Sequence, residues 1–69
     1  MIEVFKTDVQ DAEIAMALVQ KLHRHFPGCR INFDLNDSDN ILRVEGKTIC
    51  IETIIDFLNS NGFQCEILV

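Results

Sequence analysis

The chain has 69 residues, of which 48% are hydrophobic and 25% charged, and this length provides one small domain. Eleven carboxylates against six Lys and Arg give a net charge of -5, which repels nucleic-acid phosphates. No apolar run approaches the ~18 residues of a membrane span, and the first residues lack a secretory leader pattern. We therefore expect a single domain over residues 1–69 that binds neither nucleic acid nor a membrane.

Residues 2–6 alternate as a β-strand does, with Ile2 and Val4 on one face and Glu3 and Phe5 on the other. We assign Ile2 and Val4 to the interior of the domain. This assignment places Phe5 on the outer face of the strand.

A helical period follows over about residues 9–26, where the apolar side chains form a single arc. Thr7 and Gln10 fit a capping box at the start of this helix, and Pro27 and Gly28 predict its end. The arc consists of Ala12, Ala15, Met16, Leu18, Val19, Leu22 and Phe26.

Two strands come next. Residues 29–35 return to a period of two, with Ile31 and Phe33 inward. Residues 36–40 are polar and predict a turn. Residues 41–45 form a third strand in which Ile41 points outward, and the short connection makes the two strands an antiparallel hairpin.

A second helix is expected over about residues 49–60, with Thr48 as its N-cap. Gly62 suits the left-handed backbone at the end of a helix. Residues 63–69 alternate again and predict the last strand, with Cys65 inward and Leu68 outward.

The element order β-α-β-β-α-β predicts an α+β fold, a ferredoxin-like sandwich with both helices on one face of a four-stranded antiparallel sheet. Numbered along the chain, the strands should lie in the order 4-1-3-2. The other face of the sheet is open and mostly polar. On it, Phe5, Ile41 and Leu68 would form a small apolar patch, which predicts an interaction site.

Five segments of the chain carry a family resemblance: Pro27-Gly28, Phe33-Asp34-Leu35, Leu42-Arg43-Val44, Ile54-Ile55-Asp56-Phe57-Leu58 and Asn61-Gly62-Phe63-Gln64-Cys65-Glu66. Through these segments the sequence resembles the heavy-metal-associated domain family, the small copper and zinc chaperone and transporter modules. The resemblance implies the same ferredoxin-like fold.

In that family, a Met-x-Cys-x-x-Cys loop between the first strand and the first helix binds the metal through two thiolates. Residues 7–15 of this chain contain no cysteine. One alignment places Ala12 and Ala15 at the two cysteine positions, and another places Asp11 and Ile14 there. The comparison therefore predicts a degenerate metal site and no cofactor.

A Cu(I) or Zn(II) site built from other ligands is the alternative, with His25 and Cys29 as candidate ligands. A closed zinc site would need further ligands from elsewhere in the chain. The three cysteines, Cys29, Cys50 and Cys65, are odd in number and scattered. This pattern indicates free thiols in a reducing cytoplasm, and the periodicity places all three in the interior.

No nucleophile with a partner base, phosphate-binding loop or paired-carboxylate cleft indicates catalysis, so we expect that the protein is not an enzyme. The sequence predicts a stand-alone, non-catalytic binding module of the heavy-metal-associated fold. Its partner would be another protein or a second copy of the chain, as a homodimer. Copper or zinc binding, or a role in metal transport with a non-standard ligand set, is the alternative function.

Overall fold

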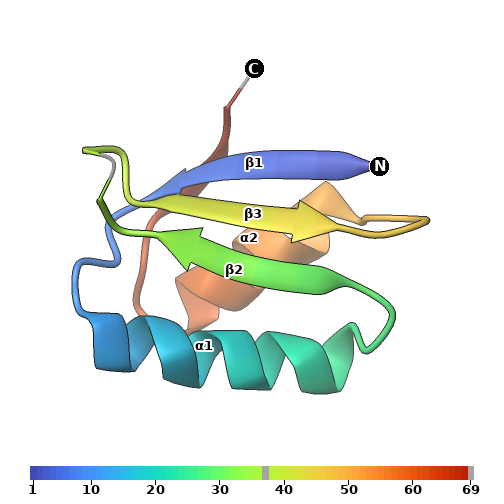
Figure 1. Ribbon diagram of the computed structural model, residues 1–69, viewed down its shortest axis with the longest axis horizontal. Helices are drawn as coiled ribbons and strands as arrows, with labels where there is room; N and C mark the ends of the chain where they lie inside the picture. The colour runs from blue at the N-terminus through green and yellow to red at the C-terminus, as the bar shows by residue number, and fades with distance from the viewer. Residues whose placement is uncertain (37, 69) are drawn as a thin grey trace.

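Six elements occur in the predicted order in the computed structural model, which describes residues 1–36 and 38–68 (Figure 1). Asp37 of the predicted turn and Val69 of the predicted last strand lie outside the described residues. The elements are β1 (Ile2–Thr7), α1 (Ala12–His25), β2 (Arg30–Asp34), β3 (Ile41–Glu45), α2 (Ile51–Ser60) and β4 (Cys65–Ile67).

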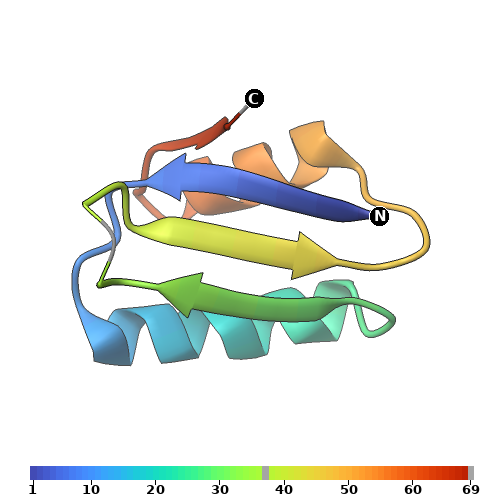
Figure 2. The same ribbon diagram turned by 45° about the horizontal axis from the view of Figure 1, so that its top comes forward.

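The four strands form one antiparallel sheet in the order β2-β3-β1-β4. This order and the α+β class confirm the predicted ferredoxin-like layout. Both helices cover the same face of the sheet, which Figure 2 shows with the strands in front and the helices behind. Helix α1 lies against the edge strand β2, and α2 lies against β4. Among the described residues, neither helix is long and apolar enough to cross a membrane.

The core lies between the sheet and the two helices and is almost entirely aliphatic. Burial of these side chains is the main favourable term in the stability of so small a domain. The core cluster consists of Phe5, Val9, Ala15, Leu18, Leu22, Ile31, Leu42, Val44, Ile54 and Leu58.

The face of strand β1 that packs against the core is the opposite of the predicted one. Phe5 lies opposite Leu42 of β3 and Ile67 of β4, and both Phe5 and Leu42 are completely buried. The alternation then places Val4 and Ile2 on the open face, where Ile2 is 58% exposed. A Phe side chain removes more apolar surface from water than Val or Ile does, which favours the observed orientation.

Helix α1 begins at Ala12, three residues later than expected, and its N-cap is Asp11. The Asp11 carboxylate accepts hydrogen bonds from the backbone N–H groups of Glu13 (2.8 Å) and Ile14 (3.3 Å). The predicted cap at Thr7 is therefore wrong. An Asp at this position satisfies two free donors and also interacts favourably with the positive end of the helix dipole.

The start of α2 also differs from the prediction. Its N-cap is Cys50, which makes no side-chain capping bond, so Thr48 is not the cap. Cys50 is exposed instead of interior, and Cys29 and Cys65 are only half-buried. Gly62, with φ of +90°, adopts the left-handed backbone predicted at the end of the helix.

Candidate functional site

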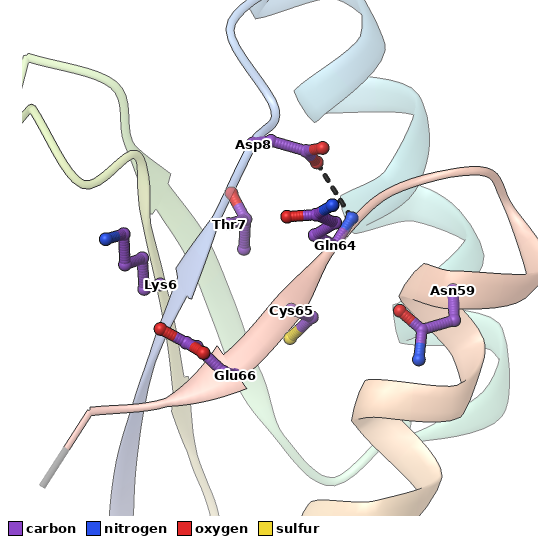
Figure 3. Close-up of a pocket in the computed structure, with 7 residues that line it drawn as sticks. All are labelled: Lys6, Thr7, Asp8, Asn59, Gln64, Cys65 and Glu66. Carbon is purple, nitrogen blue, oxygen red and sulfur yellow. Dashed lines mark hydrogen bonds between the residues drawn. The ribbon is translucent and has the colours of Figure 1, made fainter.

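The loop between β1 and α1 is hydrogen-bonded to other parts of the chain at both of its sides. Heavy-metal-associated domains carry their metal ligands in the corresponding loop. Thr7 is buried at the end of β1, and its Oγ1 donates to the Asn40 carbonyl oxygen (2.6 Å) and accepts from the Val9 N–H (3.2 Å). On the other side, Asp8 Oδ1 accepts from the Gln64 N–H (2.8 Å), the bond drawn dashed in Figure 3. The loop is thus held by the turns before β3 and before β4.

The four positions that the two alignments assign to metal ligands do not form a metal site. Ala12 and Ile14 are exposed and Ala15 is buried, and none of the three offers a donor atom. Asp11 caps α1 through its carboxylate. A carboxylate suits hard cations and not the soft Cu(I) that thiolates bind.

A polar hollow of about 410 Å³ lies beside this loop, between β1, β4 and the end of α2 (Figure 3). Burial raises the pKa of the Cys65 thiol to about 11, so the thiol is protonated at neutral pH and is a weak nucleophile and metal ligand. The hollow carries charges of both signs, which does not favour a single class of ion. It is lined by Lys6, Thr7, Asp8, Asn59, Gln64, Cys65 and Glu66.

The alternative ligands, His25 and Cys29, lie in separate surroundings. The His25 ring packs edge-on against Phe57, with 5.4 Å between ring centroids. The Cys29 sulfur lies beside Gly46, so close that a Cβ on Gly46 would be 2.7 Å from it. Within residues 1–36 and 38–68, no group of three or more His, Cys, Asp or Glu side chains could hold a metal ion. The structure therefore adds no third ligand to this pair.

Cys50 is the most reactive of the three thiols by its surroundings. It is exposed, and the Thr53 hydroxyl donates a hydrogen bond to its sulfur (2.9 Å), which lowers the pKa of the thiol. Cys50, like Cys29 and Cys65, is a free thiol. Cys50 is thus an accessible thiol whose pKa is lowered.

The predicted apolar patch on the open face is not assembled as expected. Phe5 lies in the core, so its placement in the patch is wrong. Ile41 and Leu68 do lie on the open face, but Ile41 is only 6% exposed and Leu68 39%. Ile41 also stands opposite charged residues on both neighbouring strands, Lys6 and Asp34. Of the three predicted side chains only Leu68 is exposed, and the exposed apolar side chain of Ile2 lies on the same face.

An apolar groove lies instead between α1 and the edge strand β2, with a volume of about 500 Å³. Met16, the fifth residue of α1, is 65% exposed, although the helical period placed it on the core-facing arc. The groove is lined by Ala12, Ala15, Met16, Val19, Gln20, Ile31, Asn32, Phe33, Leu35 and Asn36. We refer to it as the α1–β2 groove.

The α1–β2 groove was not predicted, although the sequence contains a signal for it. The predicted apolar arc contains seven residues, the first of which is Ala12 and the last Phe26. The strand order places α1 at the β2 edge of the sheet, where no further strand lies beyond β2 in the described chain. An arc wider than the sheet beneath it leaves one flank uncovered, and Ala12 and Met16 lie on that flank.

Comparison with protein-family models, with curated proteins and with solved structures finds no significant match to this chain.

Proposed function

We propose that the protein is a non-catalytic interaction module of the heavy-metal-associated fold that binds an extended polypeptide segment in its α1–β2 groove. The groove itself is the observation that carries this proposal. It combines an apolar floor and walls with an edge strand, and an edge strand offers backbone N–H and C=O groups to an added strand.

The chemistry of the groove favours a polypeptide over a small molecule. Ile31, Phe33 and Leu35 alternate along the chain, and their side chains point to the helix side of the sheet. A segment that pairs with β2 would place every second side chain against them, between the strand and Met16 of α1. Backbone hydrogen bonds would supply affinity, and the apolar contacts would supply specificity.

The family likeness supports the view that a metal site has been replaced by a structural element. At the start of α1, Asp11 caps the helix where relatives place the thiolate loop, and the loop from Thr7 to Asp11 is bonded to both neighbouring turns. On this proposal, the loop has lost the sulfur ligands of the heavy-metal-associated domains and kept the scaffold.

A peptide selection tests the proposed function. A library of extended peptides is displayed against the folded protein, and binders are mapped by amide NMR shifts. We expect binders with apolar residues at alternate positions that shift the amides of β2 and of α1 around Met16. Met16→Lys, at an exposed position, should abolish binding without unfolding the protein, and Lys47→Glu in the loop after β3 is the control. Binders that map to another surface, or the absence of binders to a chain that is monomeric, would contradict the proposal.

A metal titration separates this proposal from the metal-binding alternative. The reduced protein is titrated with Cu(I) and with Zn(II), and the Cys29→Ser and His25→Ala variants are compared with it. We expect no stoichiometric high-affinity binding. Tight binding at one ion per chain that is lost in Cys29→Ser would favour the alternative.

A further inference from the structure

The sequence of the edge strand β2 is complementary to itself when two copies run antiparallel. It runs Arg30, Ile31, Asn32, Phe33, Asp34, with a cation at one end, an anion at the other and an amide in the centre. Cross-strand neighbours in antiparallel sheets interact most favourably when charges are opposite and apolar residues meet.

Two copies of β2 placed antiparallel about a two-fold axis at Asn32 satisfy this preference at the four positions that flank Asn32. Arg30 of each copy stands opposite Asp34 of the other, and Ile31 stands opposite Phe33. The two kinds of pair also lie on different faces of the sheet. The charged pairs fall on the open face, where Arg30 is exposed, and the apolar pairs fall on the helix face. Asp34 uses one carboxylate oxygen to accept from the Asn36 N–H (3.1 Å), which leaves its second oxygen for a guanidinium.

The α1–β2 groove extends the same match to the helix layer. Helix α1 lies along β2 (Figure 2), so a two-fold axis at Asn32 brings the α1 helices of both copies side by side and antiparallel. The flank of α1 that carries Ala12, Met16 and Val19 borders this edge. Each copy would cover the exposed Met16 of the other, and the two open grooves would become one enclosed apolar layer.

We propose that this chain forms a two-fold homodimer in which β2 pairs antiparallel with β2 of a second copy, centred on Asn32, and joins two four-stranded sheets into one of eight strands. The inference rests on the proposed function, since it names the polypeptide segment that the α1–β2 groove binds. A second copy is favoured over an unrelated segment because β2 itself carries the required charges in the required reverse order. The net charge of -5 opposes self-association in general, whereas β2 is locally neutral.

The charge pattern permits a sharp test by exchange. In the dimer of an Arg30→Asp chain, both charged pairs become carboxylate pairs, and in that of an Asp34→Arg chain, both become guanidinium pairs. We expect each variant alone to dimerise at least about tenfold more weakly than the unaltered chain. A mixture of the two variants restores opposite charges in both pairs, so it should form a heterodimer nearly as tight as the original dimer. The double variant Arg30→Asp/Asp34→Arg should dimerise as well as the original.

Sedimentation equilibrium of the full chain, with one variant labelled in the mixture, measures all of these affinities. Lys47→Asp and Asp56→Arg are the matched controls, because they change the net charge equally at exposed positions away from β2 and should leave dimerisation unaltered. Far-UV circular dichroism establishes that each variant is folded, and Met16→Lys gives an independent loss of dimer through the helix layer. A monomer at millimolar concentration, or a dimer that neither single reversal weakens, would overturn the proposal. So would weakened variants that the mixture fails to rescue. A monomer that still binds selected peptides in the α1–β2 groove would overturn the dimer alone and leave the proposed function standing.

Discussion

Truncation of Phe5 measures which face of β1 meets the core. Phe5 is completely buried between Leu42 and Ile67, so Phe5→Ala should leave a cavity and lower the free energy of unfolding by about 3–5 kcal/mol. A domain of this size has about 3–10 kcal/mol in total, so the Ala variant will be partly or wholly unfolded. Phe5→Leu retains most of the volume and should cost about 1.5 kcal/mol or less.

The neighbouring residue on the opposite face is the matched control. Val4 is only half-buried on the open face, so we expect Val4→Ala to cost about 1 kcal/mol or less. Because the chain has no Trp or Tyr, unfolding in urea is followed by far-UV circular dichroism. Each kcal/mol should lower the melting temperature by about 4–8 °C. Equal losses for Val4→Ala and Phe5→Ala, or a folded Phe5→Glu variant, would refute the assignment of Phe5 to the core.

Four further outcomes follow from the hydrogen bonds, backbone conformation and thiol burial described above. Thr7→Val leaves the Val9 N–H without its acceptor, so it should lower the free energy of unfolding by about 1–3 kcal/mol and speed amide exchange at Val9. Thr7→Ser keeps the hydroxyl and should do neither. Equal behaviour of the two variants would contradict this. Asn40 has φ of +49°, a left-handed backbone that strains a β-branched residue. In urea unfolding, Asn40→Val should therefore lower the free energy of unfolding by about 1–2 kcal/mol, and Asn40→Gly should not. An unchanged free energy of unfolding in the Val variant would contradict this. Iodoacetamide at pH 8 should modify Cys50 before Cys65 in peptide mass analysis, because a hydrogen bond lowers the pKa of Cys50 and burial raises that of Cys65 to about 11. The folded state then keeps a Cys65 proton that the unfolded state loses above pH 9, so the free energy of unfolding should fall from about pH 9 toward 11, and less so in Cys65→Ala.

The order of elements could be predicted because each has a clear local signal. The bounds of β3 coincide with the predicted residues 41–45, and the positive φ of Gly62 was expected from its place after a helix. Alternating and helical apolar periods are properties of a single segment, and they survive in the folded protein because the tertiary contacts reinforce them.

The face of β1 could not be decided from its own residues. Each of its two faces carries both apolar and charged side chains, with Ile2, Val4 and Lys6 on one side and Glu3 and Phe5 on the other. The choice depends on which face lies under the helices, and that depends on pairing with strands about forty and sixty residues further along. A one-residue change in register exchanges the two faces completely.

The start of α1 and the α1–β2 groove were missed for a related reason. Thr7, Asp8 and Asp11 can all accept hydrogen bonds from free backbone donors near a helix start. Only the folded structure shows that Thr7 bonds to Asn40 and Asp8 to Gln64, which leaves Asp11 as the cap. The groove likewise depends on how far the sheet extends beneath α1.

The central place of β1 affects how the chain can fold during synthesis. Both strands that pair with β1 are translated after it, β3 first and β4 last. Until β3 leaves the ribosome, the Phe5 side chain has no sheet neighbour to shelter it from solvent or from other nascent chains. Closing such distant pairings also slows folding relative to local contacts. Chaperone binding to ribosome-held intermediates should therefore centre on the first strand, weaken once β3 has emerged and end once β4 has paired.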